Sequence, residues 1–261
     1  MLARFGPDAA VYAGGTELLI VMKERLAHFP HLIDIKRIPG LKEIDFDAER
    51  RELSVGAATT HRDLERSLVV RERFPALGLM EAAVANIRVR NAGTIGGNLC
   101  FAEPHSDPAT LLTALDAQLT LTSTSGTRQL PMDAFITGLM ETARHHEEVL
   151  VTIIVPEPAS NAGVAYERFK LHERPTAAVA AVIAVDDGAI TDARVVAGSG
   201  KSAAAASATI AADVIRDEVE TSGDVFESEE YTSQLARTVG RRAVAAAIQR
   251  ATGEEGGRHA A

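Results

Sequence analysis

The sequence of 261 residues predicts an α+β fold in three consecutive parts. In the first half of the chain, short apolar strand patterns alternate with helical patterns, as they do in α/β units. A run rich in Pro, Ser, Asn and Gly at residues 156–163 interrupts regular structure and marks a boundary. Beyond it, two apolar strand patterns flank Asp187-Gly188, which predicts a β-hairpin. We expect three parts, at residues 1–55, 56–158 and 164–252.

The first part is predicted to contain a strand, a helix, a second strand and a hairpin. Residues Ala9–Tyr12 form a short apolar run that is typical of a buried strand. Residues 17–29 carry apolar side chains at helical spacing, and Pro30 is expected to end that helix. Further strands are expected at residues 32–35, 44–46 and 53–55, the last two as a hairpin around a charged loop.

Helix signals dominate the second part. Thr60 followed by Asp63 predicts a capped helix start, and Pro75 suits the first turn of the next helix. Residues 91–107 are expected to form a loop, after which Pro108 opens a further helix. Strands are expected at residues 118–122 and 149–155, with a turn at Ser125-Gly126.

The third part is predicted to begin with the hairpin, whose strands lie at residues 178–185 and 190–197. An Ala-rich helix and a longer helix at residues 229–251 are expected to follow, because Ala has the highest helix propensity. Residues 253–261 are expected to fray.

Charge and cysteine content exclude several classes of function. Acidic residues outnumber basic residues by 36 to 27, and a net charge of -9 leaves no basic stripe for a phosphate backbone. We therefore expect no nucleic-acid partner. Cys100 is the only cysteine, so this chain alone cannot form a disulfide or hold an iron–sulfur cluster. The spacing of the paired histidines, His28 with His31 and His145 with His146, matches no metal site, so no metal ligand is expected.

The apolar runs are too short for a membrane span, which needs roughly 18 residues. The first ten residues also lack the apolar core of a signal peptide. These two observations predict a cytoplasmic location without a membrane span.

The main functional signal is a pair of glycine segments, Ala-Gly-Gly-Thr-Glu at residues 13–17 and Thr-Ile-Gly-Gly-Asn at residues 94–98. Glycine lets a ligand approach the backbone, and consecutive free N–H groups bind phosphate. Four hydrogen bonds to a charged group give about 6–12 kcal/mol in total, whereas association costs about 4–15 kcal/mol. One segment is therefore too weak, and we expect both to hold one diphosphate. Neither segment is a Walker motif or a G-x-G-x-x-G fingerprint.

Three stretches that contain these segments, at residues 12–19, 87–100 and 102–108, resemble the FAD-binding medium subunit of the molybdenum hydroxylase family, of the carbon monoxide dehydrogenase and xanthine dehydrogenase type. Residues 224–231 and 241–243 extend the resemblance toward the C-terminus. The resemblance implies two α/β subdomains that bind FAD between them, the first one short at its N-terminus. It also implies a C-terminal domain made of an antiparallel sheet with helices.

The resemblance further implies which residues bind the cofactor, and it assigns no catalytic residue to this chain. The implied cofactor-binding residues are Tyr12, Ala13, Gly14, Gly15, Thr16, Glu17, Leu18, Val84, Thr94, Ile95, Gly96, Gly97, Asn98, Asp107, Leu150 and Lys170. Asp107 also stands at a predicted helix start, where a carboxylate commonly caps the helix, and Lys170 fits a solvated strand lysine equally. Relatives carry an acid and an aromatic residue in place of Pro175-Thr176, which predicts more open access to the flavin.

By resemblance, the chain is an FAD-dependent oxidoreductase subunit that transfers electrons. Its implied partners are a molybdopterin-binding large subunit and a small subunit with two 2Fe-2S clusters, assembled as a dimer of heterotrimers. Electrons are expected to pass from the clusters through FAD to a terminal acceptor. Two alternatives stay open: a stand-alone FAD-dependent oxidoreductase of the same superfamily, and a non-catalytic assembly module.

Overall fold

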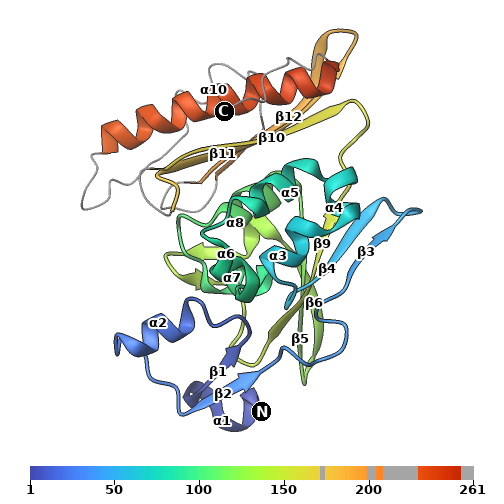
Figure 1. Ribbon diagram of the computed structural model, residues 1–261. Coiled ribbons are helices and arrows are strands. Elements are labelled where there is room, and N and C mark those ends of the chain that lie inside the picture. The colour runs from blue at the N-terminus through green and yellow to red at the C-terminus, as the bar shows by residue number, and fades with distance from the viewer. Residues whose placement is uncertain (171–173, 199–203, 208–228, 254–261) are drawn as a thin grey trace.

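The computed structural model describes residues 1–170, 174–198, 204–207 and 229–253. A five-stranded sheet, a group of helices, a four-stranded sheet and one long helix lie in successive layers, with a small N-terminal unit beside them (Figure 1). This combination of helices and antiparallel sheets confirms the predicted α+β class.

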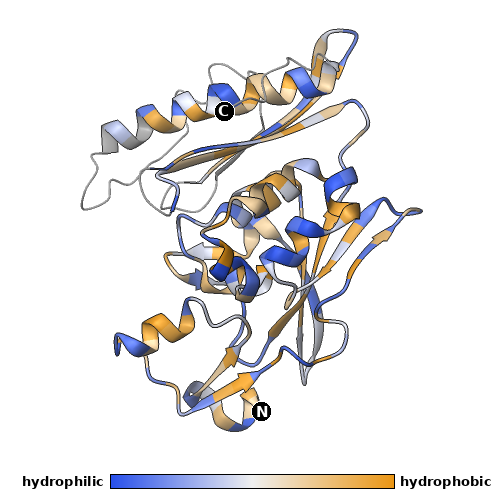
Figure 2. Cartoon of the chain, in the orientation of Figure 1, coloured by the Kyte–Doolittle hydropathy of each residue, from blue (hydrophilic) through white to orange (hydrophobic). Residues whose placement is uncertain are grey.

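The N-terminal unit is a two-stranded parallel sheet with three short helices. Its elements are α1 (Leu2–Phe5), η1 (Gly6–Asp8), β1 (Ala9–Tyr12), α2 (Leu18–Lys23) and β2 (His31–Asp34). The predicted helix at residues 17–29 is too long, because Arg25 has a positive φ of 61° and the helix ends before it. Figure 2 shows that α2 is hydrophobic over most of its length, although Leu19 and Ile20 are 43% and 56% exposed.

The central sheet is antiparallel and has the strand order β3-β4-β9-β5-β6. Its strands are β3 (Ile44–Asp47), β4 (Glu52–Gly56), β5 (Gln118–Ser123), β6 (Gly126–Pro131) and β9 (Val149–Pro156). Alternate residues of the middle strands, such as Leu53 and Val55, are completely buried against the helices. A turn (η2, Met132–Ala134) and a hairpin (β7, Ile136–Gly138; β8, Glu141–Thr142) connect β6 to β9.

Six helices cover one face of this sheet (Figure 1). They are α3 (His61–Arg66), α4 (Leu68–Arg73), α5 (Pro75–Ala82), α6 (Ile87–Ala92), α7 (Ile95–Phe101) and α8 (Asp107–Ala114). The predicted cap is confirmed, because the Thr60 hydroxyl accepts from the backbone N–H of Asp63 in a capping box. Pro75 lies in the first turn of α5, as expected.

The expectation of a loop at residues 91–107 is wrong, because α7 occupies its middle. Gly96 and Gly97 lower the helix propensity of this stretch, yet Gly96 packs so closely that a Cβ would lie 2.5 Å from Cβ of Ala57. Thr94 caps the helix by accepting from the backbone N–H of Gly97 at 3.1 Å. Close packing against Ala57 and the Thr94 cap therefore stabilise a helix where the two glycines favour a loop.

The third part is a four-stranded antiparallel sheet covered by a long helix. Its elements are β10 (Ala162–Phe169), β11 (Ala177–Asp186), β12 (Ala189–Gly198), β13 (Ala204–Ser207) and α10 (Glu229–Thr252). One face of the sheet packs on α10, and the opposite face contributes Ala180 and Val196 to the core under α8. Gly163 lets α10 approach, since a Cβ there would lie 1.9 Å from the carbonyl oxygen of Ala247.

The prediction of an Ala-rich helix after the hairpin is wrong for its first residues, 204–207. Residues Ala204–Ser207 form a strand that pairs with β12, because an available sheet edge outweighs the helix propensity of Ala. The rest of that predicted helix, and residues 224–228 of the resemblance, lie outside the described residues. The predicted helix at residues 229–251 corresponds to α10.

The division into residues 1–55, 56–158 and 164–252 remains a prediction, and the sheet order favours an earlier first boundary. The β3–β4 hairpin hydrogen-bonds to β9 within the central sheet, whereas β1 pairs with β2 alone. The first unit therefore ends between Asp34 and Ile44 by its hydrogen bonding. None of the helices in the described ranges is long and apolar enough to cross a membrane.

Candidate functional site

A cleft of about 690 Å³ opens where the three parts of the chain meet. This volume lies within the range of roughly 300–1,000 Å³ that is usual for ligand pockets. Residues from both glycine segments line it, together with residues of β9 and of the segment after β10. Of the sixteen predicted cofactor-binding residues, the cleft brings together Ala13, Gly14, Gly15, Thr16, Glu17, Leu18, Val84, Thr94, Gly96, Gly97, Asn98, Asp107 and Leu150.

The first glycine segment connects β1 to α2 and presents its backbone to the cleft. Gly15 has a positive φ of 73°, which suits glycine, and lets the chain turn sharply after the strand. In the described part of the chain, the backbone N–H groups of residues 14–17 have no hydrogen-bond acceptor. Consecutive unpaired N–H groups in a turn form a concave site for an anion.

The first glycine segment packs against the two residues directly before the second segment, Ala92 and Gly93. A Cβ on Gly14 would lie 2.3 Å from the carbonyl oxygen of Ala92 and 2.7 Å from Cα of Gly93. A Cβ on Gly93 would in turn lie 3.2 Å from the hydroxyl oxygen of Thr16. The absence of side chains at Gly14 and Gly93 therefore lets the first segment lie directly beside the start of the second one.

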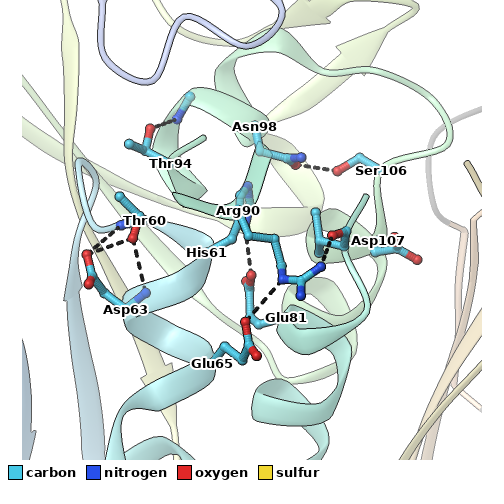
Figure 3. Close-up of polar contacts among 12 residues, drawn as sticks. Thr60, His61, Asp63, Glu65, Glu81, Arg90, Thr94, Asn98, Ser106 and Asp107 are labelled. Carbon is cyan, nitrogen blue, oxygen red and sulfur yellow. Dashed lines mark hydrogen bonds and ion pairs between the residues drawn. The ribbon is translucent and has the colours of Figure 1, made fainter. Parts of the chain in front are cut away.

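The second glycine segment does not offer the row of free backbone N–H groups that the sequence predicts. Four of its five N–H groups are engaged: Ile95 donates to the carbonyl of Thr59 at 3.0 Å, Gly96 to that of Ala57 at 2.9 Å, Gly97 to the Thr94 hydroxyl and Asn98 to the Thr94 carbonyl. The segment instead offers side chains to the cleft. The hydroxyl of Ser106 donates to Oδ1 of Asn98 at 2.5 Å, which fixes the amide (Figure 3).

Asp107 joins the second and third parts of the chain. Its carboxylate accepts from the hydroxyl of Tyr166 at 2.5 Å and from Nη1 of Arg168 at 2.8 Å, both on β10. Ser106 is the N-cap of α8, and Asp107 itself makes no capping bond, so the capping interpretation is wrong. Burial, and then the charge of Asp107, raise the pKa of Tyr166 well above its usual value, which keeps this hydroxyl a hydrogen-bond donor.

Arg174 makes a second link across the cleft, between residues that are far apart in the sequence. Its Nη2 lies 2.9 Å from Oε1 of Glu17, and its Nη1 lies 2.8 Å from Oε1 of Glu103. Burial acts to raise the pKa of Glu103, but the hydrogen bond from His105 and the charge of Arg174 together hold it below its usual value. This guanidinium connects all three parts of the chain. Sequence reasoning did not identify Arg174, because its partners are far from it in the chain.

His61 and Glu81 form a buried pair at the cleft that sequence reasoning also missed. Nδ1 of His61 lies 2.6 Å from Oε2 of Glu81, and the side chains are 3% and 0% exposed (Figure 3). His61 lines the cleft. Its one sequence signal is its place directly after the Thr60 cap, and nothing local connects it to Glu81.

Three of the predicted residues do not line the cleft. The ammonium of Lys36 lies 3.8 Å from the ring centroid of Tyr12. Ile95 is in the core and only 1% exposed, and Lys170 is exposed directly after β10.

Cys100 also lines the cleft, and burial raises the pKa of its thiol to about 11, so the thiol stays protonated. The described residues contain no group of three or more side chains able to hold a metal ion.

The sequence and the fold are both similar to those of known dehydrogenase subunits. The family described as FAD binding domain in molybdopterin dehydrogenase matches residues 1–158. The carbon monoxide dehydrogenase medium chain of Hydrogenophaga pseudoflava is 40% identical over 170 residues, an alignment that covers 65% of this chain and 58% of that one. The 6-hydroxypseudooxynicotine dehydrogenase complex subunit alpha of Paenarthrobacter nicotinovorans is 29% identical over 96% of this chain and 90% of its own.

Solved structures extend the similarity to the third part. The carbon monoxide dehydrogenase of Hydrogenophaga pseudoflava that lacks the Mo-pyranopterin moiety superposes with a TM-score of 0.89 and 32% identity. That superposition covers 95% of this chain and 92% of the other. Quinoline 2-oxidoreductase of Pseudomonas putida 86 gives a TM-score of 0.87 and 27% identity over 97% and 92% of the two chains.

Proposed function

This chain belongs to the family of FAD-binding domains of molybdopterin dehydrogenases, and from that premise we propose that it is the electron-transferring flavin subunit of a molybdenum hydroxylase complex. The first relative named above is matched over 58% of its length, so the activity of the whole complex is part of the proposal. The observation that carries it is that both glycine segments line one cleft, with Gly14 packed against Ala92 and Gly93 directly before the second segment.

The cleft has the properties that FAD requires. A diphosphate is anionic and needs hydrogen-bond donors, and residues 14–17 supply four backbone N–H groups that have no acceptor among the residues described. The isoalloxazine and adenine rings need apolar walls, which side chains such as Val84 and Leu150 supply. These donors matter because the chain as a whole carries a charge of -9, which repels an anion at long range.

We assign the predicted residues to roles that fit their surroundings. Residues 14–17 bind the diphosphate through their backbone, while Thr94 and Asn98 face the ribityl chain with polar side chains. Asp107 binds FAD close to these groups, and its carboxylate is already fixed by hydrogen bonds from Tyr166 and Arg168 of β10. Tyr12 and Ile95 support the two segments from outside the cleft. For Lys170, which is exposed and outside the cleft lining, a place beside the flavin rests on the resemblance alone.

When FAD is bound, it supplies the redox chemistry of two-electron and one-electron transfer. The residues of this chain bind it, orient it and exclude water, and no side chain is assigned a catalytic role. The thiol of Cys100 stays protonated and is the only thiol in the sequence. The iron–sulfur clusters that deliver electrons therefore belong to a small partner subunit, and the molybdopterin belongs to a large one.

The proposal is tested by purifying the chain and titrating it with FAD. Flavin fluorescence and absorbance should report binding of one FAD per chain. The reconstituted chain should then bind a small subunit with two 2Fe-2S clusters, and the complex should lose reduction of its acceptor when FAD is removed. A chain that binds no FAD, or a complex that works equally well without it, would contradict the proposal. Turnover of a substrate by the isolated chain would favour a stand-alone oxidoreductase instead.

A further inference from the structure

A buried ionisable pair lies where the glycine segments meet and has no part in the function proposed above. His61 is the first residue of α3, and its backbone N–H donates to the carbonyl of Gly93 at 3.1 Å. Its Nδ1 lies 2.6 Å from Oε2 of Glu81 on α5. Since both side chains are more than nine-tenths buried, packing and this hydrogen bond fix the imidazole.

Glu81 determines which nitrogen of the imidazole is available to a ligand. An ionised carboxylate only accepts hydrogen bonds, so Nδ1 carries a proton that it donates to Glu81. Nε2, on the opposite side of the ring, stays available to a ligand. His61 lines the cleft, and in the described part of the chain Nε2 has no hydrogen-bond partner. Because His61 lines the cleft, Nε2 is an open hydrogen-bonding position there.

The position of Gly93 shows where this nitrogen lies. A Cβ on Gly93 would be 3.2 Å from Cδ2 of His61, the ring atom bonded to Nε2, and 3.2 Å from Oγ1 of Thr16. The Nε2 edge of the imidazole and the first glycine segment therefore border the same small region. Gly14 and Thr16, whose backbone N–H groups have no acceptor in the described chain, both lie beside Gly93.

We propose that His61 is a cofactor-binding residue whose Nε2 donates a hydrogen bond to the diphosphate of FAD, with Glu81 as its positioning residue. This inference rests on the proposed FAD site. For Nε2 to donate, the ring carries both protons, and the carboxylate of Glu81 balances the resulting charge. Oε1 of Glu81 has no partner among the described residues, so His61 is the carboxylate's one recorded hydrogen-bond partner there.

Two substitutions of His61 separate cofactor binding from a structural role. In His61→Asn the amide nitrogen replaces Nδ1 and keeps the contact with Glu81, but nothing replaces Nε2. In His61→Gln the longer side chain places its amide nitrogen near the position of Nε2. The matched control is His145→Asn, an exposed histidine that does not line the cleft.

The dissociation constant for FAD is measured by flavin fluorescence with the full chain, alongside the thermal midpoint of the FAD-free protein. We expect His61→Asn to weaken FAD binding roughly ten- to a hundredfold, the effect of one hydrogen bond to a charged group. Its thermal midpoint should stay close to that of the wild type. His61→Gln should retain most of the affinity, and His145→Asn should retain all of it.

Two results would overturn the assignment of His61. One is wild-type affinity in His61→Asn, and the other is an equal loss of affinity and of thermal stability in both His61 variants. Each of these results leaves FAD binding by the wild type intact and so leaves the proposed function standing. A wild-type chain that binds no FAD would instead overturn the proposed function and the assignment together.

Discussion

The hydroxyl of Tyr166 on β10 donates to Oδ1 of Asp107 at the start of α8, over a distance of 2.5 Å. This bond crosses from the third part of the chain to the second. Arg168 reinforces it by bonding Asp107 at 2.8 Å and the carbonyl of Ala83 at 2.6 Å. The C-terminal sheet therefore holds a cleft residue in place and does more than pack against the cofactor-binding parts.

Tyr166→Phe should lower the free energy of unfolding by about 1.5–3 kcal/mol, because a buried hydrogen bond to a carboxylate is lost. Urea denaturation measures this change. Tyr12→Phe is the control, since no hydrogen bond is recorded for the Tyr12 hydroxyl in the described part of the chain and its ring still contacts Lys36. Equal stability of Tyr166→Phe and the wild type would show that the bond is not formed in solution.

Gly14→Ala should weaken FAD binding at least tenfold and destabilise the fold by about 1–3 kcal/mol, the usual effect of overpacking. The new Cβ would lie 2.3 Å from the carbonyl oxygen of Ala92 and would push the first glycine segment away from Ala92 and Gly93. Gly78→Ala is the control, because its nearest neighbours lie at 3.6 Å and leave room for a methyl group. FAD titration and denaturation measure both effects. Unchanged FAD affinity in Gly14→Ala would contradict the close contact.

The ion pair between Glu148 and Arg128 should make stability depend on pH in the acid range. Hydrogen bonds from Arg128 lower the pKa of Glu148 from its usual 4.5 to about 2. Because the folded-state pKa is the lower one, the stabilisation is present above pH 4.5 and is lost as the pH falls toward 2.

Glu148→Gln should therefore cost about 2 kcal/mol at neutral pH, an amount reduced by the partial exposure of Arg128. The difference from the wild type should shrink below pH 4.5. Unfolding curves at a series of pH values measure it, with the exposed neighbour Glu147→Gln as the control. A difference that does not change with pH would contradict this account of the pair.

Arg174→Gln should speed the release of FAD severalfold, because the bridge from Glu17 to Glu103 across the cleft is lost. The change in stability should stay below about 1 kcal/mol, since the guanidinium is partly exposed. Stopped-flow dilution measures release, with Arg194→Gln as the control, because Arg194 forms a similar exposed pair with Asp116 away from the cleft. Release at the wild-type rate at low salt would contradict a bridging role.

Local chemistry explains the elements that the sequence predicted correctly. Asp187 and Gly188 both have positive φ, at 49° and 78°, and form the tight turn that this dipeptide favours between β11 and β12. The Thr60–Asp63 capping box likewise needs residues only three positions apart. Both signals are complete within a few residues, so the sequence is sufficient to predict them.

Long-range contacts explain what the sequence could not predict. The helical conformation of Gly96 depends on close packing with Ala57, and the pairing of His61 with Glu81 depends on how α3 and α5 pack. The sequence predicts that the glycine segments act together, and residues of both line one cleft, but their backbone N–H groups differ. The N–H groups of residues 95–98 are used inside the protein, whereas those of residues 14–17 have no acceptor in the described chain.

The most direct test of the account is backbone amide hydrogen exchange with and without FAD. Residues 14–17 should exchange fast in the free chain and become protected when FAD binds, because their N–H groups gain acceptors. Residues 95–98 should be protected in both states, because their N–H groups are already bonded within the protein. Binding of FAD without any change in exchange at residues 14–17 would contradict the claim that this segment holds the diphosphate.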